Sequence, residues 1–111
     1  MLDPISHRLE YYMDLLSARQ KLVGSNIANV DTPGYQTRDI DFHFELMSEM
    51  EGLSPNVVEP GGLKVKADGN NVDLDREARL LAENAIRFNA ASNLLRSQIR
   101  IVRSAIQEGK S

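Results

Sequence analysis

The sequence DLDREARLLAENAIRFNAASNLLRSQIRIVRSAIQ, residues 73–107, decides the fold of this chain. Apolar residues recur in it at alternating steps of four and three, and the one polar residue in the row is Ser92. This spacing keeps one side of an α-helix turned toward a partner and indicates a long coiled-coil-like seam. The row consists of Leu74, Ala78, Leu81, Ala85, Phe88, Ser92, Leu95, Ile99, Val102 and Ile106.

The predicted helix, residues 73–108, is longer than a small domain is wide. Asp73 is expected to be its N-cap, and Gly109 is expected to end it. At about 1.5 Å per residue the helix is on the order of 50 Å long, against roughly 30 Å for a small domain. The alternative is an ordinary buried helix of a small bundle, which this length disfavours. Further apolar residues widen the arc to roughly 160°, so two or more neighbours are expected; they are Leu80, Ala91, Leu94, Ile101 and Ala105.

The first 31 residues repeat the same design. Asp3 followed by Pro4 is typical of an N-cap and a first helical residue. Apolar residues again follow the four-three step, with Gln20 where an apolar residue is expected. The simplest fold pairs the two helices, so the sequence predicts a mainly α protein whose terminal helices form an antiparallel, coiled-coil-like hairpin. The apolar row of the first helix is Leu9, Met13, Leu16, Val23, Ile27 and Val30.

A sharp turn is predicted after the first helix. The helix must end within residues 29–31, because Pro33 has no amide hydrogen and biases the residue before it away from the α region. Residues 32–35 fit a type II turn, with Pro33 at the second position and Gly34 at the third. On structural grounds alone, the polar residues here serve as caps and turn formers; they are Asn26, Asn29, Asp31 and Thr32.

Residues 32–72 are predicted to be a short middle made of this turn, an acidic arm and a loop. Ile40, Phe42 and Phe44 alternate with polar residues as in a strand, whereas Phe44 and Met47 have helical spacing. We expect an extended arm followed by one or two helical turns. The carboxylates of the arm come with no nucleophile or ligand set, so we expect a solvated face or contact with basic neighbours; they are Asp31, Asp39, Asp41, Glu45, Glu49 and Glu51.

A loop from Gly52 to Gly62 follows the arm. The apolar pair at 57–58 is predicted to form a small hairpin with Leu63 and Val65. The next acidic residues resemble a calcium loop, but an EF-hand requires Gly at its sixth place, and that place is occupied by Asp. We expect a turn followed by a helix cap instead; the residues are Asp68, Asn70, Asp73, Asp75 and Glu77.

The composition excludes several classes of function. The 111 residues suffice for one domain, and the net charge of −3 gives no attraction to nucleic acid or anionic membranes. The absence of Cys excludes disulfides, thiolate catalysis and Cys-based zinc sites. No apolar run approaches the roughly 18 residues of a membrane span, and the N-terminus is unlike a cleaved signal peptide. We expect a protein that is not an enzyme, with no cofactor, no metal, no nucleic-acid partner and no membrane insertion.

Residues 25–35, SNIANVDTPGY, resemble the N-terminal signature of flagellar rod and hook axial proteins. Residues 36–42 (QTRDIDF) and 69–77 (GNNVDLDRE) narrow the resemblance to proximal-rod proteins of the FlgB type, as do residues 82–84 (AEN). The similarity covers both ends of the chain, whereas the middle, roughly residues 51–67, is short. On this resemblance the signature and turn residues are Asn26, Asn29, Asp31, Thr32, Pro33, Gly34 and Tyr35.

The resemblance implies a structural subunit of the proximal rod of the bacterial flagellar basal body. Its implied partners are itself, other rod proteins, the hook-basal body adaptor protein and the flagellar type III export gate. It also implies export from the cytoplasm without cleavage, to the periplasmic side of the cell envelope. The alternative is a soluble helical adaptor or chaperone that binds partner helices without polymerising. The expected helix-packing residues are Leu9, Met13, Leu16, Val23, Ile27, Leu74, Leu81, Phe88, Leu95, Ile99, Val102 and Ile106.

Overall fold

The computed structural model describes residues 3–48 and 54–109. Expectations for Glu49, Met50, Glu51 and the first residues of the loop lie outside the described residues. The elements, in chain order, are α1 (Pro4–Ala28), β1 (Asp39–Ile40), α2 (Phe42–Ser48), β2 (Val57–Val58) and α3 (Leu74–Gly109).

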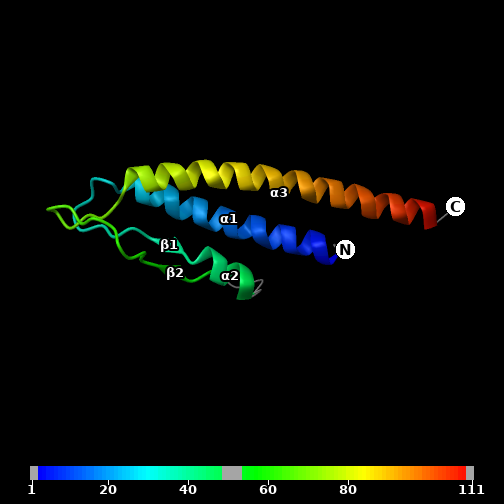
Figure 1. Ribbon diagram of the computed structural model, residues 1–111, viewed down its shortest axis with the longest axis horizontal. Coiled ribbons are helices and arrows are strands. Elements are labelled where there is room, and N and C mark those ends of the chain that lie inside the picture. The colour runs from blue at the N-terminus through cyan, green and yellow to red at the C-terminus, as the bar shows by residue number, and fades with distance from the viewer. Residues whose placement is uncertain (1–2, 49–53, 110–111) are drawn as a thin grey trace.

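The two long helices lie side by side in antiparallel order and set the shape of the molecule (Figure 1). The molecule is 70 Å long and only 24 Å and 18 Å in its other dimensions. Helix α1 lies between α3 on one side and the strands with α2 on the other. The predicted fold class, a mainly α hairpin of terminal helices with a short middle, is therefore confirmed.

Both predicted N-caps are present. The backbone N–H of Ser6 donates to Oδ1 of Asp3 at 2.7 Å, and Pro4 follows as the first helical residue. At α3, the backbone N–H groups of Asp75 and Arg76 donate to Oδ1 of Asp73 at 3.0 and 3.3 Å. These bonds satisfy amides that no helical carbonyl reaches, so the helix starts could be predicted from local sequence.

The acidic arm packs against α1, on the side away from α3. Ile40 of β1 joins Tyr11 and Leu15 in a buried cluster, and Phe42 and Leu46 pack around it. The hydroxyl of Tyr11 donates to the backbone oxygen of residue 45 at 2.7 Å. The one or two helical turns predicted after the arm are present as the seven residues of α2, which contacts α1.

The predicted hairpin between Val57–Val58 and Leu63 with Val65 is wrong. Strand β2 pairs in antiparallel order with β1 instead, with Asp39 opposite Val58 and Ile40 opposite Val57. Strand β1 is already held on the helices through both of its side chains, so it offers a fixed edge for pairing. The segment after Gly62 instead belongs to the loop next to the end of α1, where Nζ of Lys66 donates to the backbone oxygen of Val30.

Candidate assembly interface

The face of α3 that packs on α1 is not the predicted four-three row. Its buried residues are Glu77, Leu80, Asn84 and Ala91, which lie to one side of that row. On α1, the buried Leu16 and Val23 do belong to the predicted row, as expected for a seam. The α1 row is therefore turned toward α3, whereas the first half of the α3 row, from Leu74 to Phe88, is displaced from the contact and the part from Ser92 to Val102 is half-buried.

The predicted row of α3 forms a long, largely open apolar surface, which we call the open stripe (residues 74, 78, 81, 85, 88, 92, 95, 99, 102 and 106). Leu81 is 40% exposed, Phe88 38% and Ile106 54%. Leu74 and Ile27 are also exposed, and the other predicted packing residues are half-buried: Leu9, Met13, Leu95, Ile99 and Val102. Exposed apolar area of this extent along one helix is typical of a surface that another protein covers.

A groove runs between α1 and α3 beside the open stripe. We call it the seam groove; it is lined by Leu16, Ser17, Gln20, Leu81, Asn84, Ala85, Phe88 and Asn89. Nδ2 of Asn84 donates to Oε1 of Gln20 at 3.2 Å, so a polar pair sits among the apolar walls. Gln20, the polar residue in the otherwise apolar row of α1, therefore lines this groove.

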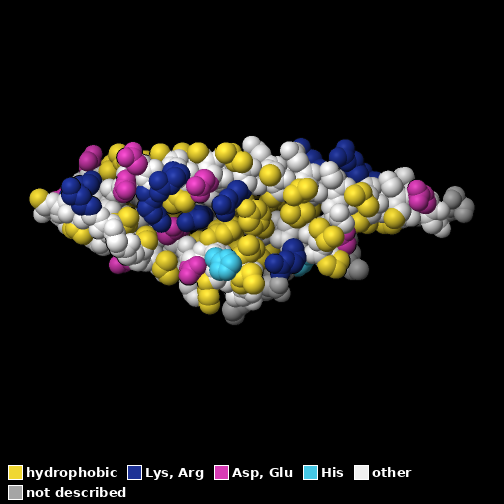
Figure 2. Space-filling model, in the orientation of Figure 1, with side chains coloured by type: hydrophobic (Ala, Val, Ile, Leu, Met, Phe, Trp, Pro, Cys, Tyr) yellow, Lys and Arg dark blue, Asp and Glu magenta, His cyan; other side chains and the backbone are white. Residues whose placement is uncertain are grey.

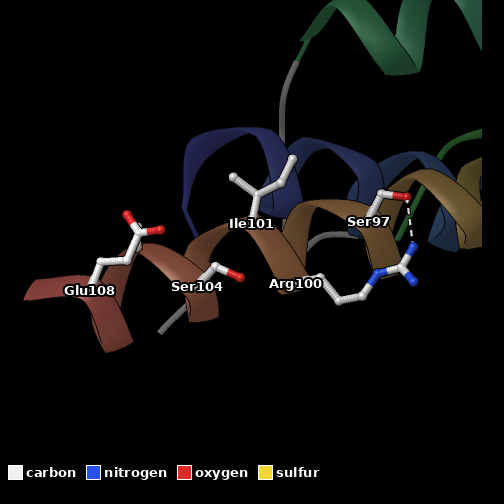
Figure 3. Close-up of a pocket in the computed structure, with 6 residues that line it drawn as sticks. Ser97, Arg100, Ile101, Ser104 and Glu108 are labelled. Carbon is white, nitrogen blue, oxygen red and sulfur yellow. Dashed lines mark hydrogen bonds between the residues drawn. The ribbon is translucent and has the colours of Figure 1, made fainter.

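Beyond Gln98, α3 continues past the start of α1 (Figure 1). Nε2 of Gln98 donates to Oδ2 of Asp3 at 2.6 Å, which marks the level where α1 begins. A shallow hollow further along is lined by α3 alone, and Ile101 within it is 61% exposed (Figure 3). Figure 2 shows apolar side chains continuing along this part of the molecule. Because one helix cannot enclose a small ligand, this surface suits another helix.

The opposite end of the hairpin is held by buried polar side chains. Asn26 is fully buried; its Nδ2 donates to the backbone oxygen of Arg38 at 2.8 Å, and its Oδ1 accepts from the backbone N–H of Arg38 at 3.0 Å. The same amide donates to Oε1 of Glu77 and accepts from the hydroxyl of Tyr35 at 2.9 Å. Asn26 thus joins α1, the turn and α3.

Asp39 is the second buried side chain that holds the turn end of the hairpin together. Arg19 of α1 donates to both of its carboxylate oxygens, from Nε at 3.0 Å and from Nη2 at 2.9 Å. Arg76 of α3 donates to Oδ2 of Asp39 through Nη2 and to Oε2 of Glu77 through Nη1 at 2.6 Å. We call Asn26, Asp39, Glu77 and the two arginines the polar junction. The expected contact of the acidic arm with basic neighbours is confirmed for Asp39.

The turn after α1 is a type II turn, as predicted. Gly34 has φ +76°, and the backbone N–H of Tyr35 donates to the oxygen of Thr32 at 3.2 Å. Nδ2 of Asn70 donates to the oxygens of Asn29 and Thr32, each at 2.9 Å. Of the other signature residues, Asn29 caps α1, whereas Asp31 and Pro33 are exposed at the tip.

The segment with the pattern of a calcium loop is a turn and a cap. Oδ1 of Asp68 accepts from the backbone N–H of Asn70 at 3.0 Å, and Asp73 caps α3. Within residues 3–48 and 54–109, no three His, Cys, Asp or Glu side chains are grouped to hold a metal ion. None of the helices in the described part of the chain is both long and apolar enough to cross a bilayer.

Replacing Gly34 by Val is expected to destabilise the protein by about 2 kcal/mol, because a β-branched side chain opposes a positive φ. The measurement is urea unfolding followed by circular dichroism. Gly24→Ala is the matched control: it lies inside α1 with open space around its Cβ, and it should stabilise by up to about 1 kcal/mol. A Gly34→Val chain within about 0.5 kcal/mol of the parent would contradict the requirement for glycine.

Because of the charge of Asp39, the free energy of unfolding should depend on pH in the acid range. Burial by itself raises the pKa of this carboxyl, but the hydrogen bonds from Arg19, the Ile40 backbone and Arg76 outweigh it, so the pKa lies below its ordinary value of 3.8. The folded state therefore binds protons less readily than the unfolded chain. The stabilisation is complete above the ordinary pKa and is lost as the pH falls through the lower, folded value.

Asp39→Asn is expected to lower the free energy of unfolding by about 3 kcal/mol at neutral pH, since it removes the buried carboxylate that two half-buried arginines share. It should also flatten the fall in stability between about pH 5 and pH 2. Urea unfolding across this range measures both effects. Asp31→Asn, at an exposed position of the turn, serves as the control and should retain the parental pH profile. An Asp39→Asn profile parallel to that of the parent would show that Asp39 is not the responsible group.

Several residues of the polar junction were not singled out as a site from the sequence. Arg19, Arg76 and Glu77 are ordinary charged residues of helices, and nothing in their local spacing distinguishes them. Their partners lie far away in the chain; Asn26 and Glu77, for example, are 51 residues apart. The resemblance of residues 69–77 to rod proteins was the one signal that pointed to this segment.

Comparison with known proteins identifies the family to which this chain belongs. A family model described as flagella basal body rod protein matches residues 13–36, which contain the end of α1 and the whole turn. The FlgB protein of Yersinia enterocolitica is 34% identical over 137 aligned positions, covering 98% of this chain and 100% of the relative. Those of Proteus mirabilis strain HI4320 and Escherichia coli K12 are 31% and 30% identical, with 98% of this chain and 100% and 99% of the relatives covered. This chain belongs to the FlgB family of flagellar basal body rod proteins.

Proposed function

We propose that this chain is a structural subunit of the proximal rod, assembling through its terminal helices with itself and with other rod proteins into a hollow drive shaft. Membership of the FlgB family supports the role as a rod component. The observation that carries the assembly step is the open stripe, because Leu74, Leu81, Phe88 and Ile106 in it are exposed and the apolar residues between Phe88 and Ile106 are only half-buried.

The stripe supports assembly rather than ligand binding for a physical reason. Its residues lie on one face of a single helix, so they form a ridge with a shallow groove beside it. A ridge and a groove of this kind fit the helix of a neighbouring subunit. The role we propose is therefore mechanical: the subunit transmits torque and encloses a passage for exported proteins.

The proposal extends to the neighbours of the subunit at the base of the rod. We place the hook-basal body adaptor protein and the flagellar type III export gate next to it, with the subunit exported uncleaved to the periplasmic side. The slender shape supports this route, because a two-helix hairpin with little core unfolds more readily than a compact domain.

Mass spectrometry of hook-basal bodies purified from the source bacterium tests the proposed function. The chain should be present in smaller amounts than hook protein and should remain after the filament is stripped. Its absence from particles that contain other rod proteins would favour the adaptor or chaperone function instead. Sedimentation over a range of concentrations is the companion measurement, because an adaptor that does not polymerise keeps a constant size.

A further inference from the structure

We infer that α1 of a second copy of this chain docks on the outer side of α3, where two carboxylates of α1 pair with a row of arginines. This inference rests on the proposed function, since it names a contact by which two subunits meet. The arginines, which we call the basic row, are Arg96, Arg100 and Arg103. The carboxylates, which we call the acidic pair, are Glu10 and Asp14.

The basic row has no acidic counterpart in its own helix. Its three side chains are exposed, and no Asp or Glu lies three or four residues before or after any of them. Within the described residues, the only side-chain bond of the row is that of Arg100 to Ser97. The first half of α3 differs, because a row of charges there alternates in sign at steps of four, from Asp75 to Arg87. Since like charges at this spacing repel in a free helix, the basic row suits an acidic partner outside its own helix.

The helix dipole accounts for neither set of charges. It favours acidic residues in the first turn of a helix and basic residues in the last. The last turn of α3 has no basic residue, and the first turn of α1 has no acidic one. The two members of the acidic pair are four residues apart and exposed, and within the described residues they make no side-chain bond. The acidic pair therefore suits a basic partner.

Both sets of charges lie on the outer side of the hairpin, away from the contact between α1 and α3. Arg100 is nine residues after the buried Ala91, and Asp14 is nine residues before the buried Val23. Nine residues amount to about two and a half helical turns, so each charge points away from the buried side of its helix. Figure 2 shows dark blue side chains along the upper edge of the molecule, over the C-terminal half of α3. A second copy laid with its α1 on the α3 of the first brings the two sets together.

The spacing of the two sets fits one register. Copies that point in the same direction, as in a rod, place α1 of one antiparallel to α3 of the next. Glu10 then lies level with Arg100 and Asp14 with Arg96, because both sets have a spacing of four residues. In its own chain, the hydrogen bond that joins the start of α1 to α3 places Glu10 level with about Ala91. The second copy is therefore shifted by roughly 14 Å toward the C-terminal end of α3. Because the two surfaces differ, the contact repeats from copy to copy without closing into a dimer.

Zero-length cross-linking tests the contact. Arg96→Lys with Arg100→Lys keeps the charge and supplies amines, which a carbodiimide joins to carboxylates in contact with them. This variant replaces the natural copy in the source bacterium, and its purified hook-basal bodies are treated with the carbodiimide. Mass spectrometry should find Glu10 linked to position 100 and Asp14 linked to position 96, in a ladder of linked copies. Asn89→Lys, on the same side of α3 but about 10 Å from the level of Asp14, is the control and should give at most a tenth of the yield.

Four results overturn the inference. Rods that contain the variant but give no link refute the contact and leave the proposed function standing. Links of Glu10 to position 96 and of Asp14 to position 100 refute the common direction of the two copies. A link of the acidic pair to a different protein refutes the choice of a second copy. Absence of the unsubstituted chain from hook-basal bodies refutes the proposed function itself.

A charge exchange tests the same contact without a cross-linker. Arg96→Glu with Arg100→Glu places like charges opposite each other and should reduce motility to less than a tenth. Arg at both positions of the acidic pair, added to this variant, should restore at least half of the parental motility. The control adds Asp31→Arg with Glu59→Arg instead, which gives the same net charge at exposed positions outside the contact, and should not restore motility. Equal motility of these two strains would overturn the inference, whatever the result of the cross-linking.

Discussion

Ile106→Asp is expected to abolish incorporation of the chain into rods and, with it, motility. Ile106 is 54% exposed, so an Asp there should change the stability of the free subunit by less than about 1 kcal/mol. In the assembled rod we expect the same position to be covered by a neighbour, where an unpaired charge costs several kcal/mol. The measurements are swimming in soft agar, the amount of chain in purified hook-basal bodies, and urea unfolding of the free subunit.

Asn93→Asp is the matched control for this prediction. It introduces the same charge on α3, at an exposed position on the side opposite the apolar arc, and should leave motility intact. Normal motility of the Ile106→Asp strain would show that the open stripe is not covered in the rod. Loss of stability by more than about 2 kcal/mol in the free subunit would instead assign Ile106 a role in folding.

Asn26→Ala is expected to lower the free energy of unfolding by about 3 to 5 kcal/mol, the largest effect of any single substitution proposed for the free subunit. The amide of Asn26 satisfies both backbone groups of Arg38 and the buried carboxylate of Glu77. Ala removes these partners at once, and each buried group left unpaired costs roughly 1 to 3 kcal/mol. Since a small domain is stable by only about 5 to 15 kcal/mol, much of the chain should unfold near 37 °C.

Thermal and urea unfolding by circular dichroism measure this loss. Asn89→Ala is the control, because Asn89 is exposed on α3 and should lose less than about 0.5 kcal/mol. A loss below about 1 kcal/mol for Asn26→Ala would mean that water replaces the amide without penalty, and the polar junction would then contribute little to stability.

The sequence predicts the helices and the turn well because the information for them is local. The four-three step, the caps at Asp3 and Asp73 and the pair Pro33-Gly34 each act within a few residues, and the structure has all of them. The strand pairing was predicted wrongly for the opposite reason. Val58 pairs with Asp39, 19 residues earlier, because Asp39 is held by Arg19, a contact without any local pattern.

The face of α3 that packs against α1 could not be predicted from the local sequence pattern either. The row with the best periodicity contains Leu81 and Phe88, yet α1 packs on the neighbouring face that contains Glu77 and Asn84. Glu77 and Asn84 orient α3 through their hydrogen bonds to α1. Because both residues are polar, the spacing of apolar residues gives no sign of this face. For this chain, the strongest apolar row thus stays exposed from Leu74 to Phe88 and only half-buried from Ser92 to Val102.

The two ends of the hairpin also differ in the kind of force that holds them, and this has a mechanical consequence. Around Asn26 and Asp39 the helices are joined by directional hydrogen bonds, which resist rotation and sliding. Past Gln98, α3 offers Ile101 and Ile106 to contacts that depend on area and tolerate small shifts. Each subunit is consequently stiff at its turn and compliant at its tip, so that twisting resistance and tolerance of bending are assigned to opposite ends of the same hairpin.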